Sequence, residues 1–266
     1  MNNGYVETNG QKLYYEIHGQ GEPLMMICGL GMDLTGYILQ VPVFSEHFQV
    51  IAFDNRDVGR SSEATGSYSI ADMADDTAGL LDDLGLESAH VFGGSMGGAI
   101  AQELALRHQE KVRKLVLCAT VGKSTPVLTL LLDVLKFIRQ HDHDNAVFPR
   151  MALLTGMTTN FLSNAEAVEQ MLSMFQNQQF PQSFDAFARQ VDATMGFDAL
   201  DRLGAVKAPA LVLAADQDIL TPVSAAREIE AAIPGAQLQI LEGGGHAFIW
   251  EISEKAHQAV IEFLKA

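Results

Sequence analysis

The feature that most constrains the fold is the segment of residues 90–107, HVFGGSMGGAIAQELALR. It predicts a short apolar strand, a turn of small residues and an amphipathic helix. The turn places Ser95 in a Gly-x-Ser-x-Gly pattern, and the small residues on both sides let the strand and the helix pack closely. Such a serine projects above the carboxyl end of a sheet, where ligands bind in open α/β folds. The pattern alone fits a nucleophile and an ordinary glycine-rich turn equally well, so other segments decide between them.

Most of the chain alternates between strand patterns and helix patterns. Continuous apolar runs are typical of strands buried on both faces of a sheet, and Asn9-Gly10 predicts a hairpin between the first two strands. The expected strands are residues 4–8, 11–18, 23–28, 49–53, 90–92, 112–119, 210–214 and 237–241. The helices expected between them end near residues 48, 84, 107, 232 and 264. This alternation predicts an α/β fold with a mostly parallel sheet covered by helices on both faces.

The pattern changes between Gly122 and Lys207, where no convincing strand is present. The helices expected here are residues 127–140, 145–157, 164–178 and 183–195. Pro149 either starts or kinks the second of these helices, and Asn164 is expected to cap the third. We interpret residues 122–207 as a helical insertion, or cap, in a core domain made of residues 1–121 and 208–266.

Composition excludes several classes of partner. The 17 basic and 33 acidic residues give a net charge of −16, which disfavours binding to nucleic acid and to anionic membranes. No apolar run approaches the length of a membrane span, and the first residues carry no signal-peptide pattern. Cys28 and Cys118 lie in apolar runs, so we expect buried free thiols. We therefore expect a cytoplasmic protein without nucleic-acid or membrane partners, and the sequence does not indicate its oligomeric state.

A serine nucleophile requires a base and an acid that orients the base. His246 is the one histidine among eight that follows an expected strand directly and is flanked by glycines, so we interpret it as the base. Two carboxylates follow the strand that ends near residue 214. Asp216 comes directly off the strand and could cap the turn. Asp218 lies before an apolar pair and a proline that fix its loop, which favours Asp218 as the acid.

The mechanism also requires hydrogen-bond donors for an oxyanion. The backbone N–H of Met96 lies at the start of a helix directly after Ser95, and we expect a second donor, the N–H of Leu30, in the loop after the third strand.

The residues that we expect to line the substrate pocket beside these groups are Gly29, Met32, Gly94 and Phe248. Apolar side chains of the insertion either roof this pocket or form the core of the insertion, and the second role is the more common one for each. These side chains are Leu130, Leu131, Leu135, Phe137, Met151, Met171, Met174, Phe175 and Phe187.

Over essentially its whole length the chain resembles the α/β-hydrolase superfamily. The motifs that carry this resemblance are GGSMGG around Ser95, the Asp54-x-Arg56-x-x-Gly59-x-Ser61 loop, the A-x-x-D loop that ends at Asp218, and Gly245-His246. The chain is most similar to small carboxylesterases, lactonases and perhydrolase-like enzymes. The resemblance implies an eight-stranded sheet with a helical cap inserted after the sixth strand. It also supports Asp218, because the chain order is then Ser95, Asp218, His246.

Four positions depart from the family pattern. Cys28 replaces the usual histidine before the oxyanion loop, and Asp57 replaces a glycine. Gly94 stands where many relatives carry a larger residue, and Ala215 replaces the glycine of the acid loop. None of these changes removes a chemical group that the mechanism uses.

The resemblance implies a serine hydrolase that cleaves carboxylic esters of small to medium acyl chains through an acyl-enzyme intermediate. Such an enzyme needs no cofactor and no metal, and its partner is a small-molecule ester. The sequence leaves two alternatives open. One is an enol-lactonase or a C–C bond hydrolase of ring-cleavage products, and the other is a slow-turnover ligand receptor on the same fold.

Overall fold

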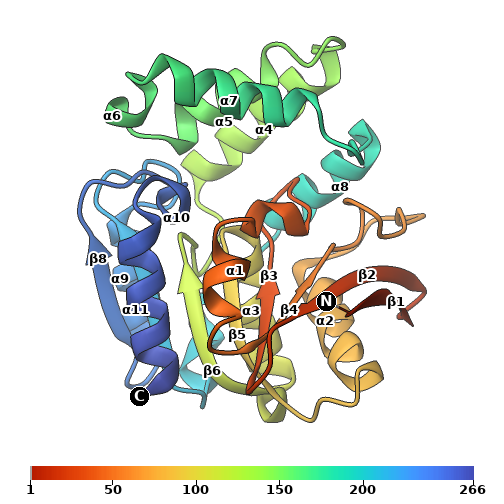
Figure 1. Ribbon diagram of the computed structural model, residues 1–266, viewed down its shortest axis with the longest axis vertical. Helices are drawn as coiled ribbons and strands as arrows, with labels where there is room; N and C mark the ends of the chain where they lie inside the picture. The colour runs from red at the N-terminus through yellow and green to blue at the C-terminus, as the bar shows by residue number, and fades with distance from the viewer. Residues whose placement is uncertain (1) are drawn as a thin grey trace.

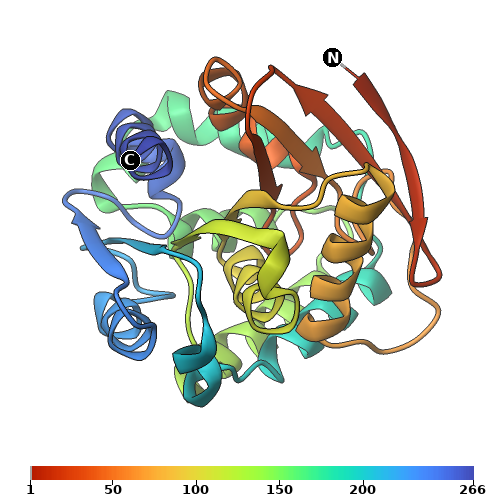
Figure 2. The ribbon, with the colours of Figure 1, turned by 90° about the horizontal axis from the view of Figure 1, so that it is seen from below.

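An eight-stranded sheet runs through the computed structural model, which describes residues 2–266 (Figures 1 and 2). The strands are β1 (Asn2–Thr8), β2 (Gln11–His18), β3 (Pro23–Ile27), β4 (Gln49–Phe53), β5 (Ala89–Gly94), β6 (Val112–Cys118), β7 (Ala210–Ala215) and β8 (Gln237–Leu241). Their spatial order is β1-β2-β4-β3-β5-β6-β7-β8. Strand β2 is antiparallel to β1 and β4, and the remaining pairs are parallel. The predicted mostly parallel α/β sheet is confirmed.

Helices cover both faces of the sheet because the side chains of its central strands alternate between two apolar cores. In β3, Met25 and Ile27 pack in one core and Leu24 and Met26 in the other. The first core includes side chains of α2 (Ile70–Asp83), α3 (Met96–Arg107) and α9 (Val223–Ala232). The second includes those of α1 (Gln40–Phe44), α10 (Phe248–Glu251) and α11 (Ser253–Lys265). Figure 2 shows these two helical layers on opposite sides of the strands.

The expectation of one continuous helix that ends near Phe48 is wrong. The chain forms a 3₁₀ helix at Leu34–Tyr37 and then the short helix α1, which ends at Phe44. A continuous helix would place Pro42 in its interior, where the missing N–H breaks a hydrogen bond. In the observed arrangement Pro42 lies in the first turn of α1, where no such bond is lost.

Five α-helices lie between β6 and β7: α4 (Pro126–His141), α5 (Phe148–Gly156), α6 (Thr159–Leu162), α7 (Ala165–Gln176) and α8 (Phe184–Met195). A 3₁₀ helix at Leu200–Ala205 follows them. Figure 1 shows α4 to α7 as a layer over the carboxyl ends of the parallel strands, with α8 beside it. Pro149 lies in the first turn of α5 and does not kink it, and Asn164 caps α7. The one-turn helix α6 was not expected. Within residues 2–266, no helix is long and apolar enough to span a membrane.

Candidate active site

Ser95 lies at the junction of β5 and α3 with a strained backbone. Its φ of 54° and ψ of −118° are unfavourable for a residue with a Cβ atom. Two hydrogen bonds hold this conformation: the Ser95 N–H donates to the Cys118 carbonyl at 2.9 Å, and the Thr120 hydroxyl donates to the Ser95 carbonyl at 2.8 Å. The end of β6 and the loop after it therefore support the serine turn. The sequence did not reveal this role for Thr120.

The glycines around Ser95 are required by close backbone contacts. A Cβ at Gly93 would lie 2.3 Å from the Gly97 carbonyl oxygen, and a Cβ at Gly97 would lie 2.0 Å from the Ile27 carbonyl oxygen. Any side chain at these two positions would separate α3 from the sheet. The small residues of the motif thus have the packing role inferred from the sequence.

Gly94, one of the departures from the family pattern, provides space for a tyrosine. A Cβ at Gly94 would lie 3.0 Å from the hydroxyl oxygen of Tyr37. The buried Tyr37 hydroxyl donates to the Ile27 carbonyl at 2.6 Å, and the side chain lines the cavity above Ser95. No sequence signal pointed to Tyr37, because its contact with the serine turn depends on the fold.

The structure brings Ser95, His246 and Asp218 into one hydrogen-bonded chain. His246 Nε2 is 3.0 Å from Ser95 Oγ, and His246 Nδ1 is 2.9 Å from Asp218 Oδ2. The competing carboxylate, Asp216, is exposed and accepts a hydrogen bond from the Gly243 N–H at 2.7 Å. This geometry allows His246 to take a proton from the serine hydroxyl while Asp218 orients the imidazole.

Asp218 is buried, yet its surroundings favour the ionised form. Its carboxylate accepts hydrogen bonds from the N–H groups of Leu220 and Thr221 at 2.8 and 2.9 Å and from the Thr221 hydroxyl at 2.6 Å. Burial raises the pKa of Asp218, but His246 and the Thr221 hydrogen bonds together lower it by more than burial raises it. The pKa therefore lies below its usual value. An ionised Asp218 can hold the imidazole of His246 and would stabilise its protonated form.

The loop that carries His246 is anchored to the insertion. The Gly245 N–H donates to Glu251 Oε2 at 2.7 Å, and Glu251 Oε1 accepts from the Thr158 N–H at 2.8 Å. The Ala247 N–H donates to the Gly156 carbonyl at 2.9 Å. Glu251 was not singled out in the sequence, where it is one of many acidic residues.

The two expected oxyanion donors belong to residues that line the cavity containing Ser95. Met96 is the first residue of α3, and the N–H groups of a first helical turn have no acceptor within their own helix. In residues 2–266 the Leu30 N–H also has no protein acceptor. Leu30 and Met96 both line the cavity that contains Ser95.

Hydrogen bonds from distant segments hold the loop after β3. The Gly31 N–H donates to Oε1 of the fully buried Gln190 in α8 at 2.9 Å. Cys28, which replaces the family histidine, is a buried free thiol that donates to the Asp33 carbonyl at 3.2 Å. The amide of Asn55 donates to the Cys28 carbonyl at 3.2 Å. The loop is therefore supported without the histidine.

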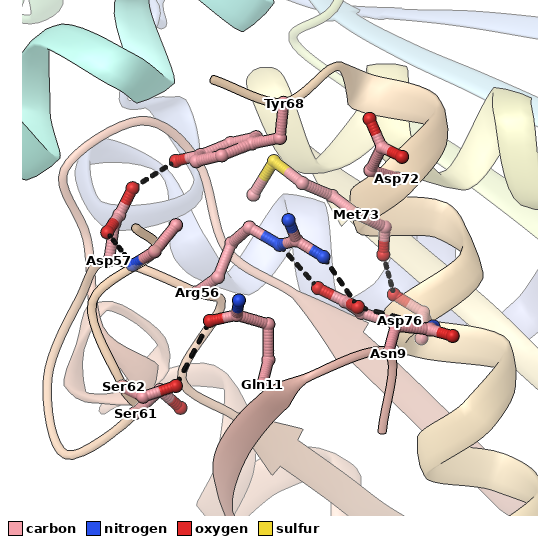
Figure 3. A network of polar contacts seen from close by, with 12 residues as sticks. Asn9, Gln11, Arg56, Asp57, Ser61, Ser62, Tyr68, Asp72, Met73 and Asp76 are labelled. Carbon is pink, nitrogen blue, oxygen red and sulfur yellow. Dashed lines mark hydrogen bonds and ion pairs between the residues drawn. The ribbon is translucent and has the colours of Figure 1, made fainter. Parts of the chain in front are cut away.

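Asp57, where the family pattern has glycine, keeps a left-handed backbone with φ of 71°. Its buried carboxylate accepts from Arg189 Nε and Nη2 of α8 at 2.9 and 2.7 Å and from the Tyr68 hydroxyl at 2.6 Å. Figure 3 shows Tyr68 pointing to Asp57, and the neighbouring Arg56 paired with Asp76 at 2.6 and 2.7 Å. The Asp57 side chain thus connects the loop after β4 to the insertion.

A mostly apolar cavity of about 260 Å³ lies above Ser95 between the core and the insertion. Of the expected pocket residues, Gly29, Met32 and Gly94 line it, together with Ser95 and His246. The insertion contributes further apolar lining, including Leu131, Leu135, Phe148, Phe175 and Phe187. Of the other insertion side chains singled out in the sequence, Leu130, Phe137 and Met174 are exposed to solvent.

The expectation that Phe248 lines the pocket is wrong. Its side chain is fully buried in the core beneath the site. Phe248 begins the short helix α10, which was not expected, and this helix directs the neighbouring residues Ala247, Ile249 and Trp250 to the cavity instead.

Residues 2–266 contain no group of three or more His, Cys, Asp or Glu side chains arranged to hold a metal ion. The sequence His141-Asp142-His143-Asp144 begins at the last residue of α4. The Asp142 carboxylate accepts three backbone N–H groups, those of Ala146, Val147 and Phe148. Asp142 therefore organises the turn between α4 and α5.

The sequence model of the family described as alpha/beta hydrolase fold matches residues 22–252. The chain therefore belongs to the alpha/beta hydrolase fold family. A protein of Azorhizobium caulinodans that carries the name carbamate hydrolase RutD is 31% identical over 248 residues, which cover 92% of this chain and 91% of that protein.

Solved structures are similar over the whole chain. The enol-lactonase from Burkholderia xenovorans LB400 superposes with a TM-score of 0.89 at 25% identity, covering 99% of this chain and 100% of that chain. A thermophilic esterase from Thermogutta terrifontis superposes with a TM-score of 0.87 at 25% identity, covering 100% and 98% of the two chains. These relatives have the same architecture and differ in the substrates that their names state.

Proposed function

We propose that this α/β hydrolase cleaves carboxylic esters of small to medium acyl chains through a covalent acyl-enzyme. The observation that carries the proposal is the hydrogen-bonded chain from Ser95 through His246 to the buried Asp218, beside an apolar cavity. A serine with a base and an ionised orienting acid is the arrangement that activates a hydroxyl for acyl transfer.

In the proposed reaction, Ser95 Oγ attacks the ester carbonyl while His246 Nε2 takes the hydroxyl proton. The tetrahedral oxyanion accepts hydrogen bonds from the N–H groups of Leu30 and Met96. The alkoxide leaving group departs with the proton from His246. Water activated by the same histidine then attacks the acyl-enzyme, and the acid product leaves.

The cavity supports the proposed size of the acyl group. Its volume of about 260 Å³ is small for a ligand pocket. Leu128, Leu131, Leu132 and Leu135 of α4 all line it and are suited to an alkyl chain. Long acyl chains would exceed this volume unless the insertion moves.

Lactone hydrolysis is the second candidate, and the similarity to the enol-lactonase favours it. A lactone carbonyl undergoes the same attack by serine, and only the shape of the leaving group differs. The carbamate named for the Azorhizobium relative also presents an acyl carbon to a nucleophile. A ligand receptor with this fold would turn over slowly, so rapid multiple turnover separates it from an enzyme.

The test is a panel of p-nitrophenyl esters of increasing acyl length, lactones, carbamates and dienones. We expect turnover of short esters, and we expect Ser95→Ala to reduce kcat/KM by at least about a thousandfold. Ser163→Ala, at an exposed serine outside the cavity lining, is the matched control with unchanged activity. Lack of p-nitrophenol release from every short ester by the folded protein would overturn the esterase proposal.

A further inference from the structure

Arg139 is a cation in the wall of the cavity. It lies near the end of α4 and is half-buried. Six other arginines form ion pairs with carboxylates. The two remaining arginines, Arg150 and Arg227, are exposed to solvent. Within residues 2–266, Arg139 is thus the one arginine that is withdrawn from solvent and has no acidic partner.

Neighbouring groups hold the guanidinium in a fixed position. Nη1 donates to Asn145 Oδ1 at 2.8 Å, and Nη2 donates to the Gln182 carbonyl at 3.0 Å. The guanidinium carbon lies 5.1 Å from the centre of the Phe148 ring, which packs edge-on against Phe187. These contacts use two of the five N–H donors of the arginine, so three have no acceptor in the described residues.

Within residues 2–266, no carboxylate of the cavity lining neutralises this charge. Among these described residues the lining contains Arg139 and His246 but neither aspartate nor glutamate. Asp142 is close in sequence, but its oxygens accept the N–H groups that begin α5. Burial lowers the pKa of Arg139, and an arginine still remains charged at neutral pH. A half-buried charge without an acidic partner keeps part of the cost of desolvation, and a bound anion would reduce that cost.

We propose that Arg139 binds a carboxylate group of the substrate, so that the favoured substrates are acidic esters or lactones rather than neutral ones. Monoesters of dicarboxylic acids and lactones that carry a carboxylate belong to this class. The planar guanidinium matches a carboxylate with paired N–H donors, and its single positive charge balances one negative charge. The amide side chains of Asn145, Gln178 and Gln182 also line the cavity and make this region polar. The inference rests on the hydrolase function proposed above.

The test compares an acidic ester with its neutral isostere. Monoethyl esters of succinic, glutaric, adipic and suberic acid are paired with the same esters in which the free carboxylate is a carboxamide. We expect kcat/KM for the acidic member of the best-fitting pair to exceed that of the amide at least about tenfold, as for a charge-assisted hydrogen bond. Arg139→Gln should bring this ratio close to one, and Arg139→Lys should retain part of it.

The ratio within one variant cancels any loss of folded enzyme, so a purely structural role of Arg139 would not change it. Arg150→Gln is the matched control, because Arg150 is an exposed arginine outside the cavity lining, and its ratio should equal that of the natural protein. Hydrolysis of both members without preference for the acid would overturn the carboxylate site and leave the proposed hydrolase function intact.

Binding gives a readout that does not depend on turnover. Calorimetry with Ser95→Ala and monoethyl adipate should show binding that Arg139→Gln in the same background weakens at least about tenfold. Such binding would support the site even if no ester were hydrolysed. Equal affinity for the acid and its amide would overturn it.

Discussion

The N–H of Gly31 donates a 2.9 Å hydrogen bond to Oε1 of Gln190, which joins the loop after β3 to helix α8 of the insertion. Gln190 is fully buried, and its amide nitrogen donates to the Arg56 carbonyl at 3.0 Å. One side chain therefore connects the oxyanion loop, the loop after β4 and the insertion. Because Leu30 is adjacent to Gly31, Gln190 is a positioning residue for the proposed oxyanion donor.

We expect Gln190→Leu to lower kcat about tenfold or more while KM changes little, since a misplaced oxyanion donor affects the transition state more than substrate binding. The unpaired Gly31 N–H and Arg56 carbonyl should also lower the free energy of unfolding by about 1–3 kcal/mol. Gln190→Glu keeps an acceptor for Gly31 and should restore part of kcat. Steady-state kinetics and urea unfolding measure both effects, with the exposed Gln170→Leu as control. Natural kcat in both Gln190 variants would contradict the positioning role.

The ion pair between Asp57 and Arg189 should stabilise the fold, and the effects of replacing its two residues should not be additive. Arg189→Gln leaves the buried Asp57 carboxylate without its cation, and we expect a loss of about 2–4 kcal/mol in the free energy of unfolding. In the double variant Asp57→Gly/Arg189→Gln, that carboxylate is absent and glycine suits the positive φ, so part of the stability should return. A double-mutant cycle by urea unfolding measures the coupling. Additive losses would show that the two side chains do not interact.

The choice between the two carboxylates after β7 can be tested directly. Asp218→Asn should lower kcat by about 10⁴-fold, because an amide stabilises the wrong imidazole tautomer. Asp216→Asn keeps an oxygen that can accept from the Gly243 N–H and removes only an exposed charge, so it should change kcat less than about threefold. Kinetics on the same ester compare the two variants. A larger loss of kcat in Asp216→Asn would show that Asp216, and not Asp218, is the orienting acid.

The sheet and the position of Ser95 could be predicted because local patterns determine them. Continuous apolar runs mark the buried strands. The turn at Ser95 requires glycines at the positions where backbone atoms of another segment leave no room for a Cβ atom. The loops of Asp218 and His246 could be found because the carboxyl ends of neighbouring parallel strands meet at one edge of the sheet. Their catalytic roles stay a prediction until the variants are measured.

The supporting residues could not be predicted, because their contacts join segments far apart in the sequence. Gln190 lies in an amphipathic helix whose pattern shows a buried face but not its partner. Tyr37 reaches the serine turn only because Gly94 leaves space for it. The error at Phe248 has a local cause. A single turn of helix decides which of four adjacent residues faces the cavity, and the sequence gives no signal for so short a helix.

Asp54, directly after β4, is a buried carboxyl that has no ion-pair partner within residues 2–266. Its side chain accepts hydrogen bonds from the N–H groups of Leu34 and Arg60, both at 2.8 Å. Burial raises the pKa of Asp54 to about 6 in spite of these bonds. In the unfolded chain an aspartate has a pKa of about 3.9. Between these two values the folded protein binds more protons at Asp54 than the unfolded chain does.

The contribution of Asp54 to the free energy of unfolding should therefore increase as the pH falls through about 6. The expected gain is about 1 kcal/mol between pH 7 and pH 5. Other carboxylates, such as Asp218 with its lowered pKa, act in the opposite direction, but they are common to the natural protein and to Asp54→Asn. The difference in unfolding free energy between these two proteins, measured by urea unfolding at each pH, isolates Asp54. It should shift by about 1 kcal/mol in favour of the natural protein on acidification, whereas a difference independent of pH would show that Asp54 ionises normally in the fold.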